Sequence, residues 1–305
     1  MIVMLMLWKG NNMKDVYILA VESSCDDTSI AIVKNGKECI AMSISSQIDV
    51  HNKFGGVVPE IASRMHCENI LYVLEDCLSQ TTLKIEDIDA IAVTYKPGLL
   101  GSLLVGLEFA KTVAAVYNKP LIGVNHLIGH IYANNIEDNL EFPLLALVVS
   151  GGHTELSIMY NNYEFELLGS TLDDAIGESF DKVARVLGFP YPGGPSIENA
   201  ASIGNNTYNL TKPVNDETYN FSYSGLKSQV LNIINNAKMK NVEINKNDLS
   251  CSFQTIAVDE IVRKVELAIK KTSINRLALA GGVSANKYLH NELQKLCDKF
   301  NVKLY

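Results

Sequence analysis

Two stretches of the sequence repeat one pattern, in which an apolar strand, a polar loop and a second strand follow each other. The first stretch runs from Tyr17 to Val33 around the loop 22–27. The second runs from Leu144 to Tyr160 around the loop 150–154, which reads Ser-Gly-Gly-His-Thr. Short apolar runs bounded by turn residues are typical of buried strands. The repeat therefore predicts a duplicated fold with two similar halves.

Segments with helical spacing follow each repeat. Residues 59–78 begin with Pro59 and place apolar residues on one helical face, and residues 251–271 do the same before a strand at 276–280. Strands that alternate with helices predict an α/β fold. A length of 305 residues suits two domains of about 150 residues each. Taking Glu137 to Pro143 as the junction, we expect α/β domains at 13–140 and 141–305.

The first twelve residues are expected to be an extension, or to result from a misassigned start, ahead of a domain that begins at Met13. Met1 to Trp8 is apolar, but no basic residue precedes it and no small-residue cleavage site follows it, unlike a signal peptide. No run in the chain reaches the ~20 apolar residues of a membrane helix. We therefore expect a cytoplasmic protein without a membrane partner.

Cysteine content and charge exclude several classes of protein. The six cysteines form no Cys-x-x-Cys pair, which excludes a disulfide framework and a zinc knuckle, although Cys25 lies inside a polar motif. The net charge of −8 gives no global nucleic-acid footprint. Residues 223–305 nevertheless hold 13 basic against 7 acidic residues, a net of +6. This excess is either a local docking face for a polyanion or an ordinary solvated surface.

Two histidines and two glycine pairs are the candidate functional features. His126 and His130 are four residues apart, which on a helix places both imidazoles on one face, as metal ligands or as two unrelated surface residues. The pairs Gly151-Gly152 and Gly281-Gly282 each follow a predicted strand. Backbone N–H groups can approach an anion closely there, so a nucleotide site and simple tight turns both stay open.

A cluster of four acids between Asp173 and Asp181 precedes a Pro-Gly-Gly-Pro bend at 192–195. Acids at the start of a helix stabilise it through the helix dipole. A contact to a ribose hydroxyl or a metal ion is the alternative.

Taken together, these segments resemble the TsaD (Gcp/YgjD) family, the catalytic subunits of tRNA N6-adenosine threonylcarbamoyltransferase. The resemblance extends from residue 17 to about 300 in the family's order. The matching segments are 21–28 (VESSCDDT), 55–60 (GGVVPE), 62–64 (ASR) with His66, 125–130 (NHLIGH), 150–154 (SGGHT), 180–182 (FDK), 191–195 (YPGGP), 221–227 (FSYSGLK), 252–254 (SFQ) and 281–286 (GGVSAN).

The resemblance implies a two-domain actin/Hsp70/sugar-kinase-like (ASKHA) fold with duplicated RNase H-like domains. It implies transfer of a threonylcarbamoyl group from threonylcarbamoyl-AMP to N6 of adenosine 37 in tRNAs that read ANN codons. The implied partners are tRNA, a smaller paralogous subunit (TsaB-like) and an ATPase subunit (TsaE-like). With tRNA as a substrate, Lys227 and Arg263 in the basic C-terminal part become candidate contacts.

The family's functional residues carry over to matching positions. His126 and His130 would bind one divalent metal ion, Fe²⁺ or alternatively Zn²⁺, and Asp27 matches an acidic position near the phosphates. The residues that would hold the adenylate are Val148, Val149, Ser150, Gly151, Gly152, Asp181, Gly194, Glu198 and Asn286.

One departure concerns the metal. The family's third protein ligand is an aspartate beyond the point where this sequence ends, at Tyr305, so we expect a truncated chain with an incomplete site and reduced metal affinity. A non-catalytic scaffold of the same complex is therefore one alternative. A metallopeptidase is another, but Leu127 stands where the glutamate of a His-Glu-x-x-His motif would be.

Overall fold

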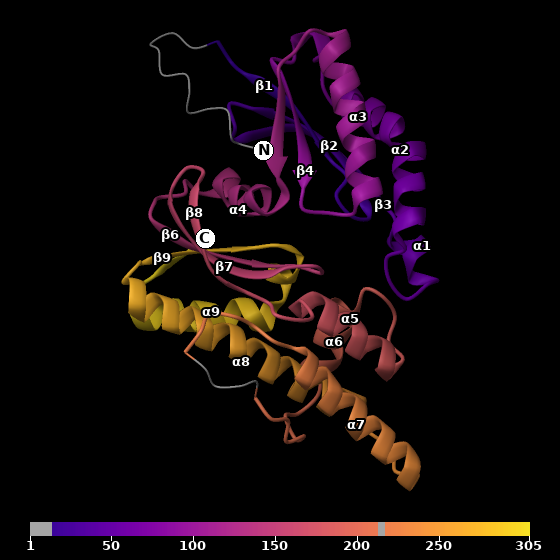
Figure 1. The fold of residues 1–305 in the computed structure, drawn as a ribbon, viewed down its shortest axis with the longest axis vertical. Coiled ribbons are helices and arrows are strands. Elements are labelled where there is room, and N and C mark those ends of the chain that lie inside the picture. Colours follow the sequence, from indigo (N-terminus) through magenta and orange to yellow (C-terminus); the bar gives the residue numbers. More distant parts are fainter. Residues whose placement is uncertain (1–13, 213–216) are drawn as a thin grey trace. The chain divides into compact units, whose positions relative to one another are not determined.

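The computed structural model describes residues 14–212 and 217–305, which form two compact units divided between Asn139 and Leu140. The division lies one residue before the domain boundary expected from the sequence. The expected extension at 1–12 lies outside the described residues. Each unit contains one five-stranded sheet with helices, so the predicted α/β class is confirmed (Figure 1).

The first unit has the strand order β3-β2-β1-β4-β5. Its elements are β1 (Tyr17–Glu22), β2 (Asp27–Lys34), β3 (Glu38–Ser46), α1 (Ile48–Asn52), α2 (Pro59–Ser79), a 3-10 turn (Ile85–Asp87), β4 (Ala90–Lys96), α3 (Leu100–Val116), β5 (Leu121–Asn125) and α4 (His126–Glu137).

The second unit has the strand order β10-β9-β6-β7-β8. Its elements are β6 (Leu144–Val149), β7 (Thr154–Asn161), β8 (Glu164–Ser170), α5 (Ile176–Leu187), α6 (Gly193–Ser202), α7 (Ser224–Lys240), α8 (Lys246–Thr272), β9 (Arg276–Ala280), a 3-10 turn (Gly282–Ala285), α9 (Lys287–Phe300) and β10 (Lys303–Leu304).

The two sheets have the same topology. In each, the first strand pairs antiparallel with the second and parallel with the fourth, as β1 does with β2 and β4, and β6 with β7 and β9. A strand with a neighbour on each side and both faces covered is apolar throughout, which explains the unbroken runs 18–21 and 144–149. The predicted duplication is confirmed at the level of strand order.

The hairpin between β2 and β3 turns at Asn35 and Gly36. Their φ angles are +50° and +66°, the left-handed conformation that a tight turn requires and that Asn and Gly adopt at low cost. A turn with two such residues at its centre matches the right-handed twist of the strands on either side. An Asn-Gly pair between two apolar runs is itself a sequence signal for such a hairpin.

Each unit has its own hydrophobic core. In the first, α2 and α3 pack side by side against one face of the sheet, where Ile70, Val73 and Ala110 meet Leu19 and Ile91 (Figure 1). In the second, the core joins the sheet to helices α5 to α9, and Phe180 and Phe253 stack edge to face with ring centroids 5.1 Å apart. In the part of the chain that the structure describes, no helix has the length and apolar character needed to cross a bilayer.

Helix α8 begins earlier than the apolar periodicity predicts. The sequence suggested a start near Cys251, whereas the helix starts at Lys246. The side chain of Asn245 accepts hydrogen bonds from the backbone N–H groups of Asn247 and Asp248, and so caps a polar first turn that the apolar pattern does not reveal.

Phe180→Ala is expected to destabilise the protein by about 3–5 kcal/mol, because it leaves a cavity beside Phe253. Phe180 is 1% exposed, so the cavity has no route to solvent. Phe165→Ala is the matched control, since that ring is 51% exposed, and its effect should stay within about 0.5 kcal/mol. Urea unfolding of both variants gives the comparison; equal effects would contradict the proposed core.

Candidate functional site

The carboxyl ends of three parallel strands meet at one edge of the first sheet. β1 pairs with β4 and β4 with β5, all parallel, and the strands end near Glu22, Thr94 and Asn125. Polar side chains at such an edge lie within reach of each other, and in open α/β sheets this edge is the usual place for ligands. These three positions frame the candidate metal site.

The first turn of α4 holds His126 and the second holds His130. Asn125 caps the helix, since its Oδ1 accepts hydrogen bonds from the N–H groups of Leu127 and Ile128 at 2.9 and 3.3 Å. The helix assumed for the His126–His130 spacing is therefore present, and the two imidazoles share a face of it. Their Nε2 atoms are 3.1 Å apart.

Glu22 supports His126 from the strand edge. Its Oε2 lies 3.0 Å from His126 Nδ1 and accepts a hydrogen bond from Thr94 Oγ1 at 2.6 Å, while its Oε1 accepts one from the Ser24 N–H at 2.6 Å. Burial alone would raise the pKa of Glu22, but the hydrogen bonds from His126, Ser24 and Thr94 outweigh it and lower the pKa to about 2. Glu22 is therefore a carboxylate at neutral pH.

The histidine pair has the geometry of two ligands of one metal ion. Two nitrogens bound to a tetrahedral zinc at about 2.05 Å are about 3.3 Å apart, close to the 3.1 Å observed between the Nε2 atoms. A carboxylate on the far nitrogen of a ligating histidine is the usual second partner in such sites. Among the described residues, no group of three or more His, Cys, Asp and Glu side chains could hold a metal. The donor set fits two ligands of a metal ion.

The loop after β1 is held in place by buried groups. The carbonyl of Cys25 accepts hydrogen bonds from His66 Nε2 at 3.0 Å and from Ser102 Oγ at 3.2 Å. Desolvation and the charges of Asp26 and Asp27 raise the pKa of Cys25 to about 12, even though part of this residue reaches the surface. Cys25 is therefore a neutral thiol at physiological pH and is not an activated nucleophile.

Asp27 follows in the same loop, at the first position of β2. Partial desolvation and the neighbouring carboxylate of Asp26 raise the pKa of Asp27 above its ordinary value, against smaller opposing effects of Ser46, His66 and Gln47. The structure places Asp27 directly after the loop that follows Glu22, in the same unit as the histidine pair.

The second unit repeats this arrangement with glycines. β6 and β9 run parallel with Val148 beside Ala280, so the loops after Val149 and Ala280 leave the same edge of the sheet. A Cβ atom added to Gly151 or Gly152 would meet no atom within 4 Å. Among the described residues, the N–H groups of these two glycines have no hydrogen-bond partner. Open amides beside a strand end can bind an anion.

Close backbone contacts hold the glycine loops together. Gly281 has a φ of +94°, and a Cβ there would lie 2.3 Å from the carbonyl oxygen of Val149. At the start of α5, a Cβ on Gly177 would lie 2.5 Å from the carbonyl oxygen of Ser150, whose Oγ accepts a hydrogen bond from the N–H of His153. Only glycine fits at these two contacts without a shift of the backbone.

Three of the predicted adenylate residues stabilise helix starts in this unit. Asp181 Oδ1 accepts a hydrogen bond from the N–H of Gly193 at 2.7 Å, at the first residue of α6. Glu198 Oε1 accepts one from the N–H of Lys287 at 2.7 Å, and Asn286 Oδ1 accepts one from Leu289 at 2.9 Å, both at the start of α9. Gly194 lies in the first turn of α6, where a Cβ would meet no atom within 4 Å.

The two predicted tRNA contacts are already paired with acids. Lys227 Nζ lies 2.5 Å from Asp174 Oδ2, and Arg263 Nη2 lies 2.8 Å from Glu260 Oε1. Their charges are largely neutralised within the unit, which favours the alternative of an ordinary paired surface at these two positions. The contact to tRNA stays a prediction.

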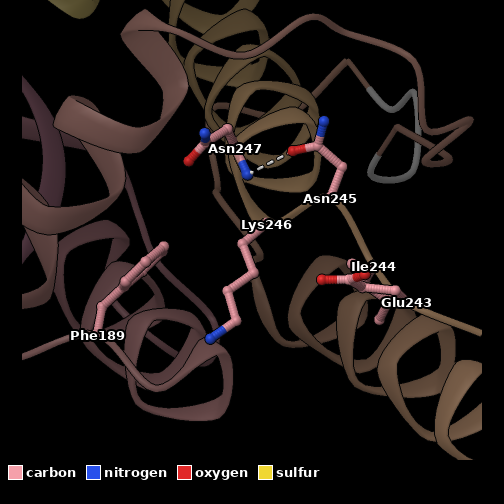
Figure 2. Close-up of a pocket in the computed structure, with 6 residues that line it drawn as sticks. All are labelled: Phe189, Glu243, Ile244, Asn245, Lys246 and Asn247. Atoms are coloured by element: carbon pink, nitrogen blue, oxygen red, sulfur yellow. Dashed lines mark hydrogen bonds between the residues drawn. The ribbon is translucent and has the colours of Figure 1, made fainter.

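A surface hollow of about 570 Å³ lies at the start of α8, and none of its lining residues belongs to the glycine loops (Figure 2). It is lined by Phe189, Glu243, Ile244, Asn245, Lys246 and Asn247. The ammonium of Lys246 lies 5.7 Å from the centre of the Phe189 ring. None of the residues predicted for the site lines this hollow, so it does not change the assignment.

Sequence reasoning missed several residues of these two edges. Glu22 could have been found as the acid at the end of an apolar strand. Thr94 and Gly177 carry no local signal, because their roles depend on partners distant in the sequence.

Comparison with known proteins agrees with this geometry. Residues 38–305 match the family TsaD, described as tRNA N6-adenosine threonylcarbamoyltransferase. A protein of that name from Bacillus subtilis is 52% identical over 283 residues, which cover 92% of this chain and 82% of that protein. Its counterpart from Staphylococcus haemolyticus is 49% identical over 292 residues, covering 95% and 85%.

The chain belongs to this family. It is an acyltransferase of tRNA threonylcarbamoyladenosine biosynthesis, and it acts on N6 of adenosine in tRNA. Of the readings that the sequence left open, this one is favoured over the scaffold and the metallopeptidase.

Solved structures confirm the fold. Component A of (R)-2-hydroxyglutaryl-CoA dehydratase from Acidaminococcus fermentans matches with a TM-score of 0.54 at 14% identity, covering 96% of this chain and 91% of that one. HypF from T. kodakarensis matches with a TM-score of 0.63 at 14% identity, covering 95% and 44%. The predicted ASKHA fold of this TsaD-family chain is confirmed by these likenesses.

Stability should fall in acid partly through Asp174. Burial alone would raise the pKa of Asp174, but hydrogen bonds and charges of Lys182 and Lys227 outweigh it and lower the pKa below 3.8. A carboxylate with a lowered pKa stabilises the fold above its unfolded pKa and loses this contribution as pH falls through the folded pKa. The stability gap between the wild type and Asp174→Asn should therefore narrow from about pH 6 to about pH 3. Urea unfolding across that range tests this, and a constant gap would contradict it.

Proposed function

We propose that His126 and His130 of this TsaD-family protein bind one divalent metal ion, Fe²⁺ or alternatively Zn²⁺. The observation that carries the proposal is the 3.1 Å separation of their Nε2 atoms, with Glu22 on the opposite nitrogen of His126. When bound, such an ion supplies a Lewis acid that polarises a carbonyl or phosphate oxygen. A third protein ligand is expected from the family resemblance alone.

We propose that the second unit binds the acyl donor, threonylcarbamoyl-AMP. The open amides of Gly151 and Gly152 suit the phosphate, as does the first turn of α6 at Gly194. The strand end at Val148 and Val149 and the hydroxyl of Ser150 position this loop. The side chains of Asp181, Glu198 and Asn286 complete the proposed set of binding residues.

The proposed acceptor is adenosine 37 of tRNAs that read ANN codons. Its N6 attacks the carbamoyl carbon, a C–N bond forms, the bond from that carbon to the phosphate oxygen breaks, and AMP leaves while N6 loses a proton. Amide N–H groups aimed at the leaving phosphate stabilise the charge that develops there. Asp27 is proposed to act near the phosphates, and its raised pKa makes it a better proton acceptor than a carboxylate of ordinary pKa.

We propose that a smaller paralogous subunit and an ATPase subunit assist the reaction, as the family resemblance implies. We also propose the cytoplasm as its location, where the tRNA substrate is processed.

His126→Ala is expected to lower threonylcarbamoyl transfer by more than about 100-fold. Loss of a supporting residue around a metal ligand already costs about 10–100-fold, and this variant removes the ligand itself. The measurement is the amount of modified nucleoside formed in unmodified tRNA, with the acyl-adenylate supplied by a threonylcarbamoyl-AMP synthase and with the partner subunits present.

The control is His290→Ala, which removes an exposed histidine of α9 and should leave transfer unchanged. The same preparations are incubated with a peptide library. Peptide cleavage without tRNA modification would favour the metallopeptidase, and neither activity in the wild type would favour the scaffold.

Gly151→Val is expected to weaken AMP binding by about 10-fold or more, a change of about 1.4 kcal/mol, because its side chain fills the space in front of the open amides. Gly225→Val is the matched control, since Gly225 also has no atom within 4 Å of an added Cβ but lies in α7. Isothermal titration with AMP measures both variants. Equal affinities would contradict the proposed donor site.

A further inference from the structure

We propose that Glu22 is a positioning residue that fixes the tautomer of His126, so that the unprotonated Nε2 faces the metal position. The inference rests on the proposed metal-binding role of His126 and adds a residue that the sequence did not single out. Glu22 is the last residue of β1, and it reaches a histidine 104 positions later in the chain.

The three contacts of the Glu22 side chain determine where the proton lies. Oε1 accepts a hydrogen bond from the Ser24 N–H. Oε2 accepts one from the Thr94 hydroxyl and also lies next to His126 Nδ1. The Ser24 N–H on Oε1 and the Thr94 hydroxyl on Oε2 place both oxygens of this carboxyl group in the accepting role. The 3.0 Å contact to Nδ1 therefore requires a proton on Nδ1.

Ser24 is the other group near this nitrogen, with its Oγ 3.1 Å from Nδ1. A hydroxyl can accept as well as donate, so it is compatible with a protonated Nδ1. Only a protonated carboxyl group that donates to Nδ1 would reverse the assignment, and the two donors already directed at Glu22, the Ser24 N–H and the Thr94 hydroxyl, disfavour that state.

The consequence appears at the other side of the imidazole ring. With its proton on Nδ1, neutral His126 has a lone pair on Nε2, and this atom lies 3.1 Å from Nε2 of His130. A histidine binds a metal through an unprotonated nitrogen, and the partner of its other nitrogen sets which one that is. Glu22 thus prepares His126 as a ligand before any metal arrives.

Glu22→Gln tests this because glutamine has the same shape as glutamate but replaces one of the two accepting oxygens with an NH₂ group. The Ser24 N–H cannot reverse, so the glutamine carbonyl should take the Oε1 position. The amide NH₂ then takes the Oε2 position, where the Thr94 hydroxyl can reverse to accept from it. His126 must also accept at Nδ1, which moves its proton to Nε2.

The first measurement is the tautomer of His126 in the metal-free full chain, from long-range ¹H–¹⁵N NMR spectra. We expect a protonated Nδ1 in the wild type and a protonated Nε2 in Glu22→Gln. The second measurement is Zn²⁺ affinity by competition with a chelator, which we expect to be about 10–100-fold weaker in Glu22→Gln.

The matched control is Asp89→Asn. Asp89 also belongs to the first unit, and its Oδ2 accepts a backbone hydrogen bond, from Tyr17 N–H at 2.9 Å. This variant makes the same chemical change away from the histidines and should keep both the wild-type tautomer and the wild-type Zn²⁺ affinity. A weakened affinity in both variants would indicate a general structural effect and overturn the inference.

The outcomes separate the inference from the proposed function. A wild-type His126 protonated on Nε2 overturns the inference without any variant, so the test holds even if Glu22→Gln does not fold. Zn²⁺ binding that is lost in His126→Ala but unchanged in Glu22→Gln overturns the inference and leaves the metal site. A wild type that binds no Zn²⁺ overturns the proposed metal site and, with it, the role of Glu22 in directing a ligand.

Discussion

Parallel pairing of two strands in each sheet is the constraint on which the candidate site depends. Because β1 runs parallel to β4, and β6 to β9, the residues that follow these strands come out at a shared edge. The register is held by buried apolar side chains inside the strands, such as Leu19 beside Ile91. The polar residues at the strand ends add little to this pairing and are available for chemistry.

The two units use their edges for different chemistry. In the first, the edge presents side chains, with a carboxylate directed at an imidazole and two imidazole nitrogens facing each other. In the second, the edge presents backbone groups. The absence of a side chain lets Gly281 lie close to the carbonyl oxygen of Val149 and leaves open space beside Gly151. A common topology thus carries the proposed metal site in one unit and the proposed anion site in the other.

The strands, the long helices and the two candidate loops could be predicted because their signals are local. Apolar runs give β1 and β6, the Asn35-Gly36 pair gives a hairpin, and the spacing of His126 and His130 gives a shared helix face. The support around them could not be predicted in this way. Glu22 meets Thr94 across 72 positions of the chain, and the close contact of Gly177 with Ser150 arises only when the chain folds. The polar start of α8 was missed because only the capping residue Asn245 marks it, whereas the apolar pattern begins later.

Helix capping by Asp181, Glu198 and Asn286 has a consequence for genetics. Each of these side chains holds the first turn of α6 or α9, whatever else it binds. Losing such a cap costs about 1 kcal/mol, which is a noticeable part of a domain's margin against unfolding. In a deep mutational scan scored by growth, substitutions at these three positions would lower growth through reduced protein abundance as well as through loss of the proposed ligand binding. Measuring abundance alongside fitness would be needed to separate the two.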